Sequence, residues 1–458
     1  AFSPSESPAI TVKEVDLSGF VPNVQSTTGA FVGNFRWGPA KKATLVDTEA
    51  TLAEKFGSPT ATGAVDFLSA AQFLRYSSAM FVVRELTSAA KNATSSVSVV
   101  TNVNNRDHWD EVKSSFGADS GDTNVGAWIA KWAGALGNSL KVEICTAAGF
   151  AAWAYKGEFD AAPGTSAYAS ARSGSGDECH IVVIDEDGNI SGTVGTVLER
   201  FAFVSMASDA KAADGTSNYA LEVINSASEY VWLAHWDGDL TTLSNAGTAA
   251  SGTTFGNPSA AISKSLTGGV DSGTLTTAEV ATGFDLFEDT DTIQVDFLIA
   301  PGMANASDQA TVVNDLAGIA GTTRKDCVVV TSPDRAAVVN NSTPVTATTT
   351  TVGSFNSSSY VVVDNNYLKV YDKFNDQYVF IPAASTTAGV MAATDANAAP
   401  WFSPAGQRRG QYFGVTALAY SPTKAERDTL YKAGVNPVAN IPGQGILLFG
   451  DKTFLNRP

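Results

Sequence analysis

Cysteine, histidine and charged side chains are scarce in this 458-residue chain. The three cysteines stand far apart and form no CxxC pair, which argues against a disulfide framework and fits assembly in a reducing cytoplasm. The three histidines do not occur in HExxH or another metal-binding spacing. We therefore predict no metal site and no cofactor. The residues concerned are Cys145, Cys179, Cys327, His108, His180 and His235.

The common motifs of catalysis and nucleotide binding are also missing. No GxGxxG follows a predicted strand, and neither GxxxxGK[ST] nor GxSxG occurs. Acidic pairs such as Glu288-Asp289 are expected by chance among 46 acidic residues. We predict no catalytic residue, no cofactor-binding residue and no enzyme activity.

The chain lacks a signal-peptide pattern, and no window approaches 18 consecutive apolar residues, so we predict no membrane insertion. The net charge of −17 argues against nucleic acid as a partner. Charged residues make up only 16% of the chain. Two interpretations of this low charge content remain open. Much of the surface could be buried against neighbouring subunits, or the chain could be an acidic domain whose surface is rich in Ser, Thr and Ala.

Charge is distributed unevenly along the chain. Residues 401–458 hold seven Lys and Arg against three acids, a net +4, so the other 400 residues carry −21. A basic face that meets an acidic partner and a solvated basic surface both explain this asymmetry.

Hydrophobic periodicity predicts a mixed α/β fold. Residues 29–40 and 79–86 indicate strands, with a helix over 60–77 between them. Residues 293–300 and 326–331 are strands joined by a helix over 307–319, which favours parallel pairing. Three strands at 360–363, 368–371 and 377–381 are typical of a meander, followed by a helix over 423–433 and a strand at 445–450.

These elements predict a multi-domain chain, α/β with α+β character. A discontinuous α/β core domain comprises 23–88 plus 268–458, and a mixed domain, 89–267, is inserted into it. Residues 1–22 form an extended N-terminal arm. Its apolar residues alternate in two short sets and can add to the sheet edge of another subunit or of its own. They are Ile10, Val12, Val15 and Leu17.

Five stretches stand out as motifs: TGAFVGNFRWGPA at 28–40, VYDKFND at 370–376, WFSPAGQRRG at 401–410, AERDTLYKAGVNP at 425–437 and LFGDKT at 448–453. In their order and spacing they resemble the tail sheath proteins of large contractile-tailed phages. The resemblance covers 10–86 and 268–458 well and the insertion weakly. The motif residues that we expect to be structural are Gly33, Trp37, Gly38, Pro39, Trp401, Gly410, Arg427, Asp428, Tyr431, Asn436, Pro437, Gly450 and Asp451.

The resemblance implies a structural subunit of a phage virion that polymerises as stacked hexameric rings around the tail tube. On contraction the subunits move as near-rigid bodies and drive the tube through the host envelope, while arms add strands to neighbouring sheets. The implied partners are the chain itself, the tail tube protein, and baseplate and tail terminator proteins, with assembly in the host cytoplasm. The inserted domain is expected to face outward.

The chain departs from the family pattern at its end. Family members normally continue past Gly-Asp-Lys-Thr with an Arg-rich helix, a further domain and a C-terminal arm. This chain stops at Pro458. The resemblance therefore implies a C-terminally truncated fragment.

The family residues also have physical roles. Gly33, Gly38 and Gly410 suit tight turns or close backbone approach. We expect Trp37 and Trp401 to anchor the core. Arg408 and Arg409 can pair with acids across a subunit or tube interface, or equally in a local salt bridge.

Two other functions remain open on sequence alone. The first is the sheath of a bacterial contractile injection system, which would assemble and contract by the same kinds of contact. A secreted carbohydrate-binding or hydrolytic protein would instead show a concave pocket with convergent polar groups.

Overall fold

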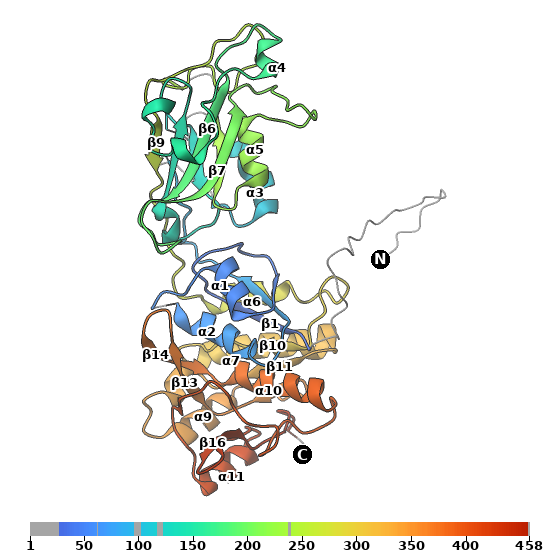
Figure 1. The fold of residues 1–458 in the computed structure, drawn as a ribbon. Coiled ribbons are helices and arrows are strands. Elements are labelled where there is room, and N and C mark those ends of the chain that lie inside the picture. The colour runs from blue at the N-terminus through green and yellow to red at the C-terminus, as the bar shows by residue number, and fades with distance from the viewer. Residues whose placement is uncertain (1–26, 62, 96–101, 117–121, 237–239, 457–458) are drawn as a thin grey trace, which may run out of the picture.

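A computed structural model describes residues 27–61, 63–95, 102–116, 122–236 and 240–456. The predicted arm strand, with Ile10, Val12, Val15 and Leu17, lies outside the described residues. The chain forms two lobes: the described residues up to the end of β3 (Met80–Arg84) and those from α6 (Thr277–Asp285) onward form the lower lobe, and the segment between β3 and α6 forms the upper lobe (Figure 1).

The lower lobe is organised around a six-stranded sheet with the order β12-β11-β10-β1-β3-β2. All strands are parallel except the edge strand β2. β1 lies between strands from two distant parts of the chain, since Gly29 is paired with both Met80 and Phe297. The strands are β1 (Gly29–Gly33), β2 (Thr44–Val46), β3 (Met80–Arg84), β10 (Phe297–Ile299), β11 (Val328–Thr331) and β12 (Val361–Val363).

Helices cover both faces of this sheet, because its central strands are apolar on both sides. α2 (Ala64–Phe73) and α10 (Ala384–Asn397) pack over one face, in a core cluster that includes Phe31, Phe67 and Ala388. α6 (Thr277–Asp285) and α7 (Ala306–Gly318) pack over the other, with Val32, Phe284 and Leu316. The other α-helices described in this lobe are α1 (Glu49–Phe56), α8 (Arg335–Val338), α9 (Pro344–Val352) and α11 (Lys424–Lys432).

The predicted parallel pair joined by a helix is confirmed, since β10 and β11 are parallel and α7 connects them. The predicted meander is wrong in its first strand. Val361–Val363 is buried and pairs in parallel with β11, as an apolar run with two covered faces does. The small sheets are β14 (Gln377–Pro382), β13 (Tyr367–Asp372) and β15 (Ala417–Leu418), and the hairpin of β16 (Val438–Ile441) and β17 (Gly445–Leu448).

The upper lobe has a four-stranded antiparallel sheet with the order β7-β6-β5-β9 and a two-stranded pair of β4 and β8. Its own core includes Trp128, Ile181 and Leu233. The elements are α3 (Arg106–Val112), β4 (Ala127–Ala130), β5 (Leu140–Cys145), α4 (Ala167–Ser170), β6 (Glu178–Asp185), β7 (Thr196–Ser205), α5 (Ala220–Ala227), β8 (Val231–His235) and β9 (Ile262–Ser265).

Candidate functional site

The junction between the lobes is built around Trp37, which follows β1 in the first family motif. Trp37 is 6% exposed, and its ring belongs to the hydrophobic cluster of the upper lobe together with Leu136 and Ala93. Its backbone N–H donates to Phe56 O over 2.9 Å, which fixes the loop to α1. A residue of the lower lobe's loop is therefore part of the upper lobe's core, as expected of a core-anchoring tryptophan.

The adjoining turn requires glycine at position 38. Gly38 has φ +94°, and a Cβ built there would lie 2.4 Å from Lys55 O. Pro39 follows it and is half-buried. This turn aims the Gly38 carbonyl at the guanidinium of Arg84, at the end of β3.

Arg84 is 1% exposed and donates to four backbone carbonyls. Three belong to the turn after β1, and the fourth is Ala133 O in the upper lobe, 2.5 Å from Nη2. Burial lowers the pKa of Arg84 to about 9, and the nearby Asp271 carboxylate acts in the opposite direction. Sequence reasoning missed Arg84; the only signal is a charged residue closing an apolar strand. The turn acceptors are Phe35 O at 2.8 Å, Gly38 O at 2.8 Å and Arg36 O at 3.3 Å.

Further bonds connect the two lobes at the same place. Ala40 N donates to Asn104 O over 2.7 Å, and Asn105 Nδ2 returns a bond to Ala40 O over 3.0 Å. Asp271, on the returning segment, accepts from Ala135 N over 2.7 Å. Most of the acceptors at this joint are backbone carbonyls, so several hydrogen bonds would have to break before the lobes could separate here.

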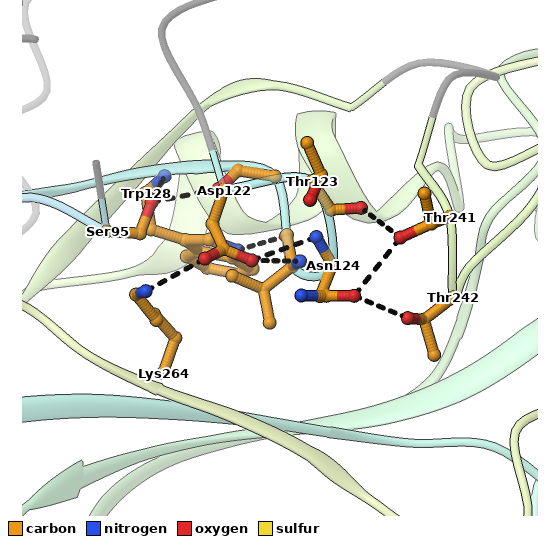
Figure 2. A network of polar contacts seen from close by, with 10 residues as sticks. Ser95, Asp122, Thr123, Asn124, Trp128, Thr241, Thr242 and Lys264 are labelled. Atoms are coloured by element: carbon orange, nitrogen blue, oxygen red, sulfur yellow. Dashed lines mark hydrogen bonds and ion pairs between the residues drawn. The ribbon is translucent and has the colours of Figure 1, made fainter. Parts of the chain in front are cut away.

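A polar network fastens loops inside the upper lobe (Figure 2). Lys264 Nζ lies 2.8 Å from Asp122 Oδ2, and Asn124 Oδ1 accepts from Thr241 and Thr242. Burial alone would raise the pKa of Asp122, but the Lys264 ammonium and the backbone N–H of Asn124 hold it below its usual value. The network connects the approach to β4 with β9 and the segment after β8.

In the C-terminal motif, Asn436 and Gly450 are in contact. Asn436 Nδ2 donates to Val363 O over 3.1 Å and to Lys452 O over 2.8 Å, and its Oδ1 accepts from Lys452 N over 2.9 Å. A Cβ at position 450 would lie 2.4 Å from Asn436 Oδ1. The buried Pro437 adds a carbonyl that accepts from Phe449 N. These motif residues therefore fasten the last described loop to the end of β12.

The motif residues Arg427, Asp428 and Tyr431 of α11, and Asp451 after β17, are partly or fully exposed. Arg427 donates to Pro422 O over 3.2 Å, and its guanidinium lies 5.4 Å from the Phe449 ring. Tyr431 carries the Lys452 ammonium 3.6 Å from its ring centroid. Asp428 and Asp451 are exposed and form no ion pair with any residue that the structure describes.

The expectation that Trp401 anchors the core is wrong, because Trp401 is 81% exposed. It stands in the loop after α10, beside Phe402. Gly410 closes this loop at a site where a Cβ would lie 2.8 Å from Leu448 O. Arg409 donates to Ser403 O over 2.8 Å, and Arg408 is exposed.

Gly33 ends β1 where a Cβ would lie 2.8 Å from the Phe31 ring and 2.9 Å from Asp66. Beside it a crevice of about 540 Å³ opens at the carboxyl ends of β1 and β10, where the strand order reverses. Asp66 lines it and accepts from Asn34 N over 2.8 Å, and burial raises the pKa of this carboxyl to about 6.

The crevice is lined by polar groups that include the carboxyl groups of Asp66, Asp271 and Asp308 and the guanidinium of Arg335, with no cysteine or histidine among its lining residues. In the parts of the chain that the structure describes, no cluster of three or more His, Cys, Asp or Glu side chains is suited to hold a metal ion. No described helix combines the length and apolar character needed to cross a bilayer.

Comparison with known proteins agrees with the fold and the motifs. Residues 274–454 match the model of the phage tail sheath protein central domain. The tail sheath protein of Enterobacteria phage T4 is 28% identical over 99% of this chain and 82% of its own length. That of Salmonella phage ViI is 28% identical over 94% of this chain and 76% of its own length.

A sheath tail protein from Listeria innocua has a similar fold, with a TM-score of 0.55 at 12% identity over 95% of this chain and 70% of its own. The similarity therefore spans both lobes and includes the junction and the C-terminal motif. The chain is therefore similar over nearly its whole length to the tail sheath proteins of contractile-tailed phages, and residues 274–454 match the central domain of that family.

Proposed function

We propose that this chain is a structural subunit that polymerises as stacked six-fold rings around a tail tube, and that the sheath contracts to drive the tube through the host envelope. The observation that supports it most directly is the similarity to tail sheath proteins over nearly the whole chain. In this proposal the chain has no catalytic role and assembles in the host cytoplasm into the virion. Its partners are other copies, the tube protein, and baseplate and terminator proteins.

We also propose the division into an arm at 1–22, a core domain at 23–88 plus 268–458, and an outward-facing inserted domain at 89–267. The six-stranded sheet supports the core domain, since it combines strands from both segments. The separate core cluster of the upper lobe supports the inserted domain.

The joint at Trp37 and Arg84 supports rigid-body movement during contraction. The Trp37 ring is buried in the neighbouring lobe, and the Arg84 guanidinium holds the turn that carries this ring and also binds one carbonyl of the upper lobe, which together leave little freedom between the lobes. A sheath that contracts by rearranging contacts between copies needs such stiffness, because flexible subunits would absorb the change internally.

Deleting residues 1–20 tests the role of the arm. The shortened chain should keep the far-UV circular dichroism and the melting temperature of the full chain, but it should fail to form polymers in sedimentation velocity. Replacing Ile10, Val12, Val15 and Leu17 with serine keeps the length and serves as the matched variant; it should show the same failure. Normal polymers from both variants would refute the arm assignment.

A further inference from the structure

Four side chains after α10 form an aromatic–basic patch, in which three are exposed and the fourth, Arg409, is half-buried: Trp401, Phe402, Arg408 and Arg409. Trp401 is 81% and Phe402 is 46% exposed, and their ring centroids are 6.5 Å apart. The Arg409 guanidinium lies 5.0 Å from the Phe402 ring. Arg408 has no ion pair within the described part of the chain. Tryptophan and arginine together are typical of residues that dominate protein interfaces.

The loop that carries the patch is held in place by backbone bonds. Gly406 N donates to Leu448 O, Gly410 N to Gly406 O, and Leu448 N to Gly410 O, each over 2.8 Å. Ala405 packs against the core cluster of α2 and α10, so the patch lies on that side of the sheet. A partner therefore meets a surface that needs little ordering on binding.

The opposite side of the sheet carries a complementary acidic–apolar surface, formed by Asp285, Leu286, Glu288 and Asp289 at the end of α6. Leu286 is 38% exposed, and the adjacent Phe287 is buried in the α6–α7 cluster and anchors the segment. None of the three acids forms an ion pair with a described residue. Burial raises the pKa of Asp315 on α7, and Asp285 and Glu288 raise it further, so uncompensated negative charge collects here.

We infer that the aromatic–basic patch of one copy docks on the acidic–apolar surface of another copy. The inference rests on the proposed self-assembly and adds the faces that meet. Both surfaces combine exposed apolar area with unpaired charge, and their charges are opposite, so each supplies what the other lacks. Another copy of this chain also suits the basic patch by its overall charge, since residues 1–400 carry −21.

The placement of the two surfaces determines the kind of assembly. One lies on the α2–α10 side and the other on the α6–α7 side of the same sheet. A contact between different surfaces is heterologous, so each added copy presents a fresh surface to the next. Such a contact closes into a ring or continues as a helix, whereas a self-complementary patch would stop at a dimer.

Charge reversal on each side tests this contact in the full-length protein. R408E/R409E and E288K/D289K should each raise the concentration needed for polymerisation about tenfold or more in sedimentation velocity. Trp401→Ala, which changes no charge, should have a similar effect. The control K156E/K211E carries the same charge change as R408E/R409E, but on the upper lobe, and should polymerise as the wild type does.

Mixing the two charge-reversed proteins in equal amounts is the decisive arm. In a polymer that alternates the two variants, the acidic patch of R408E/R409E meets the basic surface of E288K/D289K, and the unchanged patch of E288K/D289K meets the unchanged surface of R408E/R409E. Both kinds of contact join opposite charges, so polymers should form again. Circular dichroism and melting temperature show whether each variant is folded before mixing. Wild-type assembly by R408E/R409E, or failure of the two folded variants to assemble together, would overturn the inference. If the wild type itself stays monomeric, the proposed function fails as well, so the two failures are distinguishable.

Discussion

The guanidinium of Arg84 donates to the carbonyl oxygen of Ala133 over 2.5 Å, from the end of β3 in the lower lobe to the segment after β4 in the upper lobe. The same guanidinium holds three carbonyls of the turn after β1. One buried side chain thus connects the central sheet, the turn that carries Trp37 and the upper lobe.

Replacing Arg84 with methionine should lower the free energy of unfolding by about 2–5 kcal/mol, because buried carbonyls lose their donor. The exposed Arg172, in the upper lobe, gives a matched Arg→Met control that should cost less than about 1 kcal/mol. Urea titration of both variants measures the difference. Equal losses would show that Arg84 is not a structural clamp.

Gly450→Ala tests the contact with Asn436. The added methyl would meet Asn436 Oδ1 at 2.4 Å, so we expect a loss of about 1–3 kcal/mol in the free energy of unfolding. Gly318→Ala, in α7, is the control, because a Cβ there meets nothing within 4 Å. A helix prefers alanine, so the control should gain up to about 1 kcal/mol. A tolerated Gly450→Ala would contradict the close packing of this loop.

The buried carboxyl group of Asp364 should make the free energy of unfolding depend on pH. Burial raises the pKa of this carboxyl to about 7, whereas the unfolded chain loses the same proton near its ordinary value of 3.8. The folded state therefore holds the proton longer, and its stability should fall as pH rises from about 4 to about 7, by at most about 4 kcal/mol. Asp364→Asn, measured by urea unfolding at pH 5 and pH 8, should reduce this difference; the part that remains comes from other carboxyls with raised pKa, among them Asp66 at about 6 and Glu85 at about 7. An unchanged difference in the variant would exclude Asp364 as its source.

His180 should change stability with pH in the direction opposite to that of Asp364. Its Nδ1 accepts from Phe203 N over 3.0 Å and its Nε2 lies 2.8 Å from Ala161 O, so the ring is neutral with its proton on Nε2. Burial lowers the pKa of His180 below the usual 6.5, although the bond to Ala161 acts against this. Its contribution to stability is present above pH 6.5 and is lost as pH falls. A proton NMR titration of the imidazole signals should show His180 titrating below 6.5, and a pKa above that value would contradict this placement.

Apolar runs carried most of the information about the fold. The stretches around β1, β3, β10 and β11 could be assigned because each is short and apolar, and because a helical pattern separates β1 from β3 and β10 from β11. The partner of Val361–Val363 could not, because three valines satisfy a meander and a parallel sheet equally. Whether this strand joins a meander or a parallel sheet depends on whether other elements cover both of its faces, and that is not encoded in the strand itself.

Side-chain exposure was the least predictable property of the candidate surfaces. Trp37 and Trp401 both stand in family motifs, yet the first is buried between the lobes and the second is exposed. Arg84 could not be identified either, since its four acceptors are backbone carbonyls that leave no trace in residue types. Asn436 and Gly450 were identified through their motif, but their contact depends on packing that spacing alone does not give.

The central claim is that this chain works by assembling with copies of itself. Negative-stain electron microscopy of the purified full-length protein, over a range of concentrations, tests that claim most directly. The proposal predicts rings or tubes with a repeating subunit, increasing with concentration. Single, separate particles at every concentration would contradict it.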